Sequence, residues 1–403
     1  MSLNSTPSAD RIHIGIFGKR NAGKSSVINA ITGQNLAIVS DKKGTTTDPV
    51  LKAMELLPLG PVVMIDTPGL DDEGELGSLR IQKAYQILNK TDIAVLIVDA
   101  SAGITREDLE ILKRIQDKNI PCVVVFNKSD LLPSDDALSV LSDSIPKENC
   151  ISVSTVTGEN IYELKELIAR QVPAENTEKR IAADLIRPGD FVILVVPIDS
   201  AAPKGRLILP QQQTIRDVLE AGAVSIVVRE TELADTLAHL GTQPALVITD
   251  SQAFEKVSAD VPREIPLTSF SILFARYKGN LKTAVHGAFT LDTLQDGDTV
   301  LISEGCTHHR QCEDIGTVKL PNWIRKYTGK EIRFEFTSGT EFPTDLSKYQ
   351  LIIHCGGCTL NEREMKYRLK CAEDQSIPMT NYGIAIAHMH GILKRSIEIF
   401  PSL

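Results

Sequence analysis

A long apolar run and an excess of positive charge are both missing from this sequence, and each absence excludes a class of protein. No stretch approaches the roughly 18 consecutive apolar residues of a membrane-spanning helix, so we expect no contact with a membrane. Asp and Glu number 52 against 43 Lys and Arg, and the formal net charge of −9 argues against a nucleic-acid-binding protein. Residues 1–10 are polar and lack the apolar core of a secretory leader, which predicts a cytoplasmic protein.

The composition is that of a globular protein with more than one domain. Apolar residues make up 42% and charged residues 24% of the 403 positions, and a chain of this length exceeds one ordinary core. Of the seven cysteines, four lie in one C-terminal stretch, namely Cys306, Cys312, Cys355 and Cys358. A disulfide framework is not expected in a reducing cytosol, so this clustering indicates metal binding or redox chemistry.

Apolar runs alternate with amphipathic segments along most of the chain. In the N-terminal part the runs cover residues 12–17, 62–65, 93–98 and 122–126. Continuous apolar strands separated by helices predict a parallel sheet that is covered on both faces. Residues 171–180 form a polar, proline-containing linker, and further strand-like runs with helices follow it. We therefore predict an α/β protein of three domains, which span residues 8–172, 180–270 and 271–403.

The first chemical motif lies between the run at residues 12–17 and a predicted helix. Residues 18–25 (GKRNAGKS) match G-x-x-x-x-G-K-[ST], a loop whose backbone N–H groups point at phosphate beside the positive end of a helix. The Lys24 ammonium would neutralise the β- and γ-phosphates, and the Ser25 hydroxyl would bind Mg²⁺. The residues predicted to bind the nucleotide in this loop are Asn21, Ala22, Gly23, Lys24, Ser25 and Ser26.

Two further elements are expected to hold the magnesium ion and to detect the γ-phosphate. Asp66 follows a strand-like run and begins the sequence DTPG, so its carboxylate can hold Mg²⁺ through water. The N–H group of Gly69 can bond to the γ-phosphate and so register its presence. In residues 44–47 (GTTT), we assign Thr46 as the switch threonine that binds Mg²⁺. Together with Lys24, these three residues form the predicted catalytic set.

Base specificity is predicted from two loops that follow later strands. A carboxylate at Asp130 can accept both N–H groups on one edge of guanine, which adenine does not offer. Asp130 belongs to an NKSD motif that follows the apolar run 122–126, and a second, weaker loop follows residues 150–153. The residues assigned to the base are Asn127, Lys128, Asp130, Ser154 and Thr155. The ordered motifs together predict a domain that binds GTP.

These motifs resemble those of translation-factor-related GTPases of the tRNA-modification and Era type. The shared features are the G-x-x-N-x-G-K-S loop, the GTT-type switch and an apolar residue after DTPG, which is Leu70 here. Ras-type enzymes carry a water-orienting glutamine there, so hydrolysis is expected to be slow or to be helped from elsewhere. In potassium-activated members the loop asparagine helps to hold K⁺, and the resemblance implies this role for Asn21. Thr47 departs from the group, which commonly has arginine at that position.

The cysteine-rich stretch contains a second set of candidate ligands. Cys306 and His308 form a C-x-H sequence, and Cys355 and Cys358 form C-x-x-C at the end of a strand-like run. Two thiols three positions apart at a strand-to-helix turn can hold one metal, and a helix predicted at residues 361–374 favours thiolates there. Zinc in a Cys₃His site, an iron–sulfur cluster on three thiolates and a redox dithiol all remain open. A redox dithiol, however, would not need the distant C-x-H segment.

Along its whole length, the chain resembles the FeFe-hydrogenase maturation GTPases (the HydF family). The resemblance lies in the order of a GTP-binding domain, a small α/β unit and a C-terminal C-x-H…H-C-x-x-C region. It implies a P-loop GTPase domain followed by a small α/β dimerisation domain and a C-terminal α/β iron–sulfur cluster domain. The implied ligands of a [4Fe–4S] cluster are Cys306, Cys355 and Cys358. The implied labile fourth ligand is His308 or Glu313, with His354 as a nearby alternative.

The same resemblance implies a function for the whole chain. It implies a homodimeric scaffold that receives the binuclear iron precursor of the H-cluster and delivers it to apo FeFe-hydrogenase. The radical-SAM maturases are the other implied partners, and the implied cofactors are GTP, Mg²⁺, the [4Fe–4S] cluster and K⁺. The competing interpretation is a tRNA-modification or ribosome-assembly GTPase with a zinc-binding C-terminal domain. Such proteins usually bring a basic RNA-binding module or a flanking helical domain, and neither is evident in the sequence.

Overall fold

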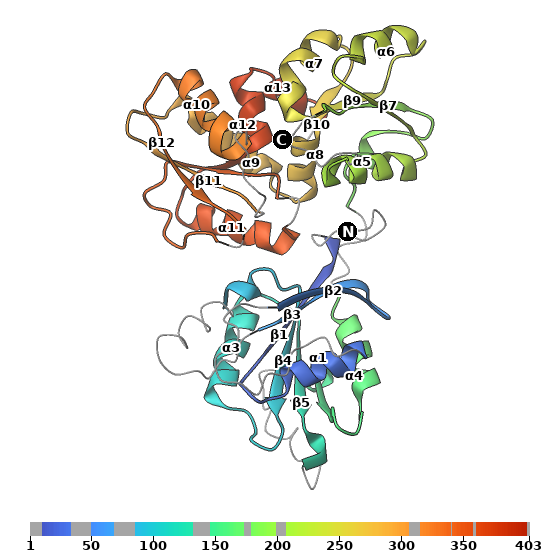
Figure 1. Cartoon of the computed structure of the whole chain (residues 1–403), viewed down its shortest axis with the longest axis vertical. Coiled ribbons are helices and arrows are strands. Elements are labelled where there is room, and N and C mark those ends of the chain that lie inside the picture. Colours follow the sequence, from blue (N-terminus) through green and yellow to red (C-terminus); the bar gives the residue numbers. More distant parts are fainter. Residues whose placement is uncertain are drawn as a thin grey trace. The chain divides into compact units, whose positions relative to one another are not determined.

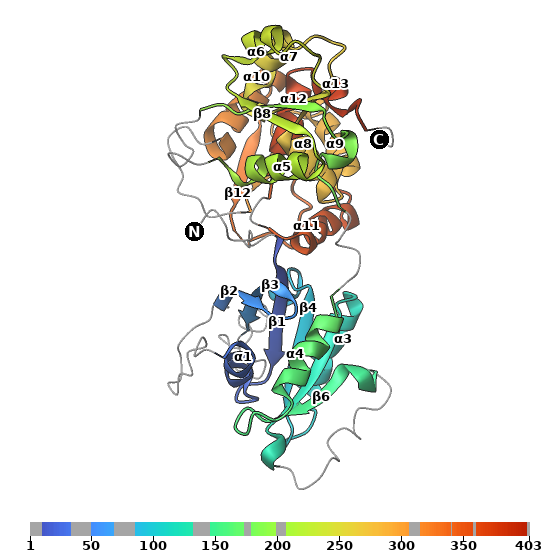
Figure 2. The same ribbon diagram turned by 90° about the vertical axis from the view of Figure 1, so that its right-hand side faces the viewer.

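The computed structural model divides into two compact units, Met1–Asn176 and Thr177–Leu403 (Figure 1; Figure 2). The residues that it describes are 10–33, 50–67, 85–131, 146–172, 179–198, 207–305, 315–339, 341–357 and 360–400. None of the helices in these ranges combines the length and the hydropathy that crossing a membrane requires.

The N-terminal unit is built on one six-stranded sheet. Its strands are β1 (Ile12–Gly18), β2 (Val50–Leu56), β3 (Gly60–Asp66), β4 (Ile93–Asp99), β5 (Cys122–Asn127) and β6 (Cys150–Val153). They lie in the order β2-β3-β1-β4-β5-β6, and every neighbouring pair is parallel except β2 with β3. Every residue of β4 except Asp99 is buried, as expected for a central strand that is covered on both faces. The predicted parallel sheet is therefore confirmed.

Helices cover both faces of this sheet. They are α1 (Lys24–Thr32), α3 (Arg106–Asp117) and α4 (Ile161–Arg170), and the short turns are η2 (Ser129–Leu131) and η4 (Lys147–Asn149). Helices α1 and α4 pack on one face, where Val27, Leu164 and Ile168 join the core. Helix α3 packs on the other face through Ile111 and Ile115 (Figure 1). The apolar pairs spaced by four residues give α3 and α4 one buried side each.

The C-terminal unit contains two four-stranded parallel sheets. The first consists of β7 (Phe191–Val195), β8 (Val224–Val228), β9 (Leu246–Thr249) and β10 (Leu267–Ser269), in the order β10-β9-β7-β8. The second consists of β11 (Thr299–Ser303), β12 (Arg333–Thr337), β13 (Leu351–His354) and β14 (Met379–Asn381), in the order β12-β11-β13-β14. The strand-like runs predicted after the linker are among these strands, which confirms the α/β fold class.

One hydrophobic core joins the two sheets of this unit. The helices are α5 (Leu209–Glu220), α6 (Leu233–His239), α7 (Phe254–Asp260), α8 (Phe270–Tyr277), α9 (Leu281–Ala288), α10 (Leu320–Thr328), α11 (Glu362–Asp374), α12 (Tyr382–Met389) and α13 (Leu393–Ile397). The 3₁₀ helices are η6 (Ala183–Leu185), η7 (Ser251–Ala253) and η8 (Phe289–Asp292), and η9 (Ile315–Lys319) is a π-helix. Leu194 of β7 and Ile302 of β11 belong to the same core, with α8, α9 and α12 between the sheets (Figure 1). The domain boundary predicted at residue 270 falls at the first residue of α8 and stays a prediction.

Candidate functional site

The loop between β1 and α1 has the geometry of a phosphate-binding loop. The Lys24 side chain is buried, and its Nζ donates to the Gly18 carbonyl oxygen at 2.9 Å and to that of the next residue at 2.8 Å. Gly18 and Gly23 have positive φ angles of 140° and 93°. A Cβ atom would lie 2.2 Å from the Ile97 carbonyl oxygen at Gly18, and 2.1 Å from Asn127 Nδ2 at Gly23. Both positions therefore require glycine, and the loop is tight enough to present its N–H groups to a phosphate.

Ser25 and Asp66 bring two oxygen atoms together at the predicted magnesium site. Ser25 lies in the first turn of α1 and donates through Oγ to Asp66 Oδ2 at 3.1 Å. Burial raises the pKa of the Asp66 carboxyl, while the charge of Lys24 and the hydrogen bond from Ser25 oppose this shift. A hydroxyl and a carboxylate are oxygen donors of the kind that Mg²⁺ takes beside a nucleotide, so the pair fits this ion. Thr46 and Gly69, also predicted here, lie outside the described residues.

The residues assigned to guanine meet at the ends of β5 and β6. Ser154 Oγ donates to Asp130 Oδ1 at 2.6 Å, which holds the carboxylate in one orientation. Ser154 Oγ also accepts hydrogen bonds from the main-chain N–H groups of Val156 at 3.3 Å and Thr157 at 3.1 Å. These bonds order the loop that contains Thr155. Asp130 is exposed, so its carboxylate is accessible to a base.

Asn127 and Lys128 connect this loop to the rest of the nucleotide site. Asn127 is buried, and its Nδ2 donates to the Ala22 carbonyl oxygen in the phosphate loop at 3.0 Å. Lys128 Nζ donates to Asp99 Oδ2 at 2.5 Å, at the end of β4. Partial burial alone would raise the pKa of Asp99, but hydrogen bonds from Lys128 and Ser101 outweigh it and lower the pKa. The sequence prediction omitted Asp99, although a carboxylate that ends an apolar strand, as Asp66 does, is the signal that identifies it.

The described residues of the nucleotide site all lie at or just after the carboxyl ends of strands in one sheet. This is the edge at which parallel α/β sheets bind ligands. Asn21 is exposed in the phosphate loop, and its φ is 62°. The residues that the structure brings to this edge are Asn21, Ala22, Gly23, Lys24, Ser25, Ser26, Asp66, Asn127, Lys128, Asp130, Ser154 and Thr155. Their assignment to GTP and the assignment of Asn21 to K⁺ stay predictions.

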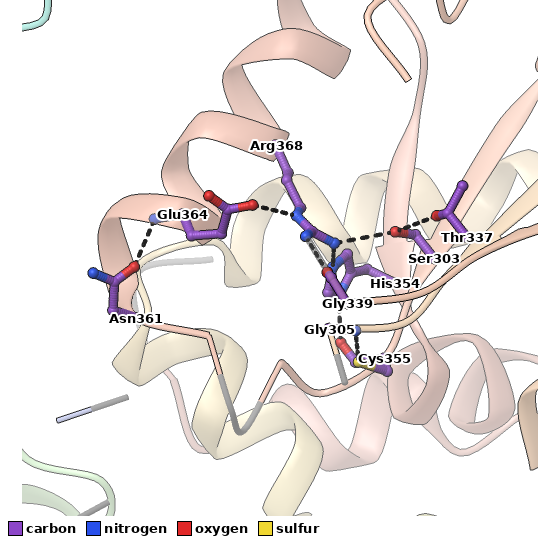
Figure 3. A network of polar contacts seen from close by, with 9 residues as sticks. All are labelled: Ser303, Gly305, Thr337, Gly339, His354, Cys355, Asn361, Glu364 and Arg368. Atoms are coloured by element: carbon purple, nitrogen blue, oxygen red, sulfur yellow. Dashed lines mark hydrogen bonds and ion pairs between the residues drawn. The ribbon is translucent and has the colours of Figure 1, made fainter. Parts of the chain in front are cut away.

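The C-x-x-C segment follows β13 in the C-terminal unit (Figure 3). The Cys355 Sγ atom accepts hydrogen bonds from the main-chain N–H groups of Gly305 at 3.0 Å and Gly357 at 3.4 Å. Hydrogen bonds from N–H groups favour the thiolate form of a cysteine, which is the form that binds metal. Gly305 directly precedes Cys306 in the sequence, so the segments that carry two of the predicted ligands meet at the Cys355 sulfur.

His354 does not fit the role of a labile ligand, because both of its ring nitrogens are engaged. Nδ1 lies 2.7 Å from the Cys355 carbonyl oxygen and Nε2 lies 3.0 Å from Arg368 Nη1. The residue as a whole is also only 1% exposed. A metal would have to displace one of these bonds inside a closed core. The structure therefore argues against His354 as the labile fourth ligand.

The remaining predicted ligands are not among the described residues. Cys306, His308, Glu313 and Cys358 lie outside the ranges that the structure describes. Within those ranges, no three His, Cys, Asp or Glu side chains are arranged to hold a metal ion. The surroundings of Cys355 nevertheless fit a thiolate-bound metal centre, since its sulfur accepts two N–H groups and lies against the residue before Cys306.

Comparison with family models divides the chain into three matched regions. Residues 13–128 match the model described as 50S ribosome-binding GTPase. Residues 181–279 match the hydrogen maturase F dimerization domain, and residues 282–399 match the hydrogen maturase F tetramerization domain. The two hydrogen maturase F models together cover more than half of the chain.

Individual relatives match a smaller part of the chain. GTPase Der from Heliobacterium modesticaldum is 30% identical over 189 residues, which are 44% of this chain and 42% of that protein. The tRNA modification GTPase MnmE from Clostridioides difficile is 33% identical over 158 residues, which are 39% of this chain and 34% of that protein. The chain thus spans less than half the length of these relatives. Among solved structures, an Era variant from Aquifex aeolicus bound to GDP and AlF₄⁻ has a TM-score of 0.36 at 23% identity, and covers 57% of this chain and 98% of its own.

Proposed function

Because the chain belongs to the hydrogen maturase F family, we propose that it is a GTP-hydrolysing scaffold of hydrogenase maturation. In this proposal it binds a [4Fe–4S] cluster and delivers the binuclear iron precursor of the H-cluster to apo FeFe-hydrogenase. The family models of residues 181–399 support the maturation role, and the GTPase model supports the nucleotide chemistry. The contact of Gly305 with the Cys355 sulfur is the single observation that supports a metal centre most directly.

The proposed GTP chemistry follows from the groups at the carboxyl edge of the N-terminal sheet. Lys24 neutralises phosphate charge, Ser25 and Asp66 hold Mg²⁺, and Asp130 selects guanine. Leu70 stands where Ras-type enzymes place a glutamine, so the intrinsic hydrolysis rate is slow. A potassium ion held by Asn21 would add positive charge beside the phosphates and raise this rate.

The proposed cluster is held by Cys306, Cys355 and Cys358, with His308 or Glu313 as the labile fourth ligand. Such a cluster supplies one exchangeable iron coordination position for the precursor. The residues of this chain hold the thiolates in place and keep them hydrogen-bonded. Delivery requires contact with apo FeFe-hydrogenase, and loading requires contact with the radical-SAM maturases.

Oligomerisation is part of the proposal, because the two family models are described as dimerization and tetramerization domains. In the same proposal, GTP turnover gates the release of partner proteins through the switch segments. Partner dissociation is then faster in one nucleotide state than in the other. Equal dissociation rates with GDP and with a non-hydrolysable GTP analogue would exclude this gating.

The decisive experiment is anaerobic iron reconstitution followed by EPR spectroscopy of the reduced full-length protein. We expect a [4Fe–4S] signal that disappears in Cys355→Ser and changes when imidazole is added. Cys371→Ser, in the same unit but on α11, is the matched control and should keep the signal. Stoichiometric zinc without an assembled cluster would overturn the proposal and leave a GTPase with a zinc-stabilised C-terminal domain.

A further inference from the structure

Arg368 of α11 is a buried charge whose bonds reach the last residues of two strands and a residue just after a third strand of the same sheet (Figure 3). Its side chain is 0% exposed. It donates to Glu364 Oε1 at 3.0 Å, to His354 Nε2 at 3.0 Å, to Ser303 Oγ at 3.3 Å and to the Gly339 carbonyl oxygen at 2.7 Å. Ser303 ends β11, His354 ends β13, and Gly339 follows β12. A buried guanidinium is costly unless it is paired in this way, so these bonds specify where the three segments lie.

The His354 ring links Arg368 to the main chain of Cys355 through two hydrogen bonds. A guanidinium N–H can only donate, so Nε2 of His354 is the acceptor of the bond from Arg368. A carbonyl oxygen can only accept, so Nδ1 of His354 bears the hydrogen and donates to the Cys355 oxygen at 2.7 Å. One tautomer satisfies both contacts. The direction of the Cys355 carbonyl group is therefore set by a side chain that α11 holds in place.

Ser303 links Arg368 to the main-chain N–H group of Cys355 in the same way. Its carbonyl oxygen accepts the Cys355 N–H at 2.9 Å. Its Oγ accepts from Arg368 and, at 3.0 Å, from Thr337 of β12. Both polar main-chain groups of Cys355 are thus fixed by residues that bond to Arg368, and the Cys355 sulfur is left facing the N–H groups of Gly305 and Gly357.

We infer that Arg368, acting through His354 and Ser303, is a positioning residue for the metal-binding thiolate of Cys355. The inference rests on the proposed function, because it takes Cys355 as a metal ligand. It assigns His354 a role in orienting the ligand in place of binding the metal. Groups that orient metal ligands and donate hydrogen bonds to sulfur change metal affinity by about 10- to 100-fold. Loss of the hydrogen bonds that link Arg368 to Cys355 is therefore expected to lower metal affinity measurably.

The test measures Co²⁺ binding by the metal-free full-length protein, followed by the thiolate-to-cobalt absorption. This probe requires a thiolate site and does not depend on which metal the protein uses. His354→Asn keeps an N–H group at the place of Nδ1, whereas the similarly sized His354→Leu does not. We expect Co²⁺ affinity to fall roughly 10- to 100-fold in His354→Leu and to be largely restored in His354→Asn.

A second pair of variants, both on α11, tests the role of Arg368 itself. Arg368→Met removes the buried charge. Lys366→Met removes a charge from a side chain that is 63% exposed and is paired with Glu362. We expect weaker Co²⁺ binding only in Arg368→Met, with GTP hydrolysis by the N-terminal unit unchanged in both. If Arg368→Met does not fold, the two His354 variants decide the question.

Wild-type Co²⁺ affinity in folded His354→Leu, or no thiolate–cobalt absorption in the wild-type protein, would overturn the inference. The expected changes in Co²⁺ affinity can also occur in a protein that assembles no iron–sulfur cluster on reconstitution. That result would support the inference and overturn the proposed cluster.

Discussion

Single residues in the nucleotide site differ in how far along the chain their partners lie. Lys24 bonds to carbonyl groups five and six positions away, within its own motif. Asp130 is oriented by Ser154, which is 24 positions away and belongs to another loop. The first contact follows from the loop sequence alone, whereas the second depends on the parallel pairing of β5 with β6. The proposed recognition of guanine therefore depends on a contact that the fold creates.

We predict that Asp130→Asn weakens GTP binding by roughly 10- to 100-fold, since a hydrogen bond to a charged group contributes about 1.5–3 kcal/mol. The amide presents a donor where guanine also presents donors, so the variant should gain preference for xanthosine triphosphate. Titration with fluorescent nucleotides measures both effects. Ser154→Ala is the control, since it frees the carboxylate but keeps its charge and should lower affinity for GTP without changing the order of preference. Unchanged GTP affinity in Asp130→Asn would show that another residue reads the base.

His13 is a titratable residue inside the core of the N-terminal unit. It lies in β1 and is 4% exposed, and its Nδ1 lies 2.8 Å from the Arg11 carbonyl oxygen. Burial lowers the pKa of His13 to about 4, and the bond to the Arg11 carbonyl opposes that shift only in part. The unfolded chain, with the ordinary pKa of 6.5, takes up a proton first as the pH falls. The stability that this residue contributes is thus complete above pH 6.5 and is lost as the pH falls toward 4.

Between pH 7 and pH 5, we predict that this single group lowers the free energy of unfolding by about 2 kcal/mol. Urea unfolding of the full chain at the two pH values, followed by circular dichroism, measures the loss. His13→Asn does not titrate and keeps an N–H group near the place of Nδ1, so its loss between the two pH values should be smaller by that amount. The assignment is wrong if the wild-type protein and the variant lose the same stability.

At the level of helices and strands, the periodicity of the sequence predicted most of the sheet-forming elements. Strands β3, β4 and β5 contain continuous apolar runs, and β1 has His13 as its one polar residue, which is the pattern of a sheet covered on both faces. Strand β2 gave no such signal, because it is an antiparallel edge strand in which most residues are partly or fully exposed. The role of His354 was not predictable either, since it depends on Arg368 in a different element. Spacing identifies motifs, but contacts between elements require the packed fold.

Strand β8 is an edge that is suited to pairing with a second copy of the chain. It is terminal in the order β10-β9-β7-β8, and no described strand pairs with its outer side. Val224 is 42% and Val227 is 45% exposed on this strand. An apolar edge strand with free main-chain groups is a template for pairing, and the family model that covers it is described as a dimerization domain. The sequence pattern predicted the strand but could not reveal that it is the last of the described strands in its sheet.

We predict that Val227→Lys shifts the full-length protein toward a smaller oligomer, because a charged side chain on an edge strand opposes pairing. Multi-angle light scattering after size-exclusion chromatography measures the mass. Leu109→Lys is the matched control, as Leu109 is 50% exposed on α3 of the GTPase unit and should leave the mass unchanged. If Val227→Lys keeps the wild-type mass, the oligomer forms through another surface.

For the whole molecule, the described hydrophobic cores separate along the chain. The two cores of the N-terminal unit lie on opposite faces of its sheet, and all of their described residues precede residue 173. The three cores of the C-terminal unit are built from described residues between 181 and 400. A unit that buries its own apolar residues is expected to fold by itself. The nucleotide site belongs to one unit and Cys355 to the other.

We therefore predict that residues 177–403 alone fold, oligomerise and assemble the iron–sulfur cluster without GTP, while residues 1–176 alone bind GTP. Cooperative unfolding by circular dichroism, light scattering, EPR after iron reconstitution and nucleotide titration test the four parts of this prediction. If the isolated C-terminal unit assembles the cluster as well as the full chain does, cluster assembly does not require the nucleotide. A folded C-terminal unit that assembles the cluster only when GTP and the N-terminal unit are added would instead place the nucleotide in assembly itself.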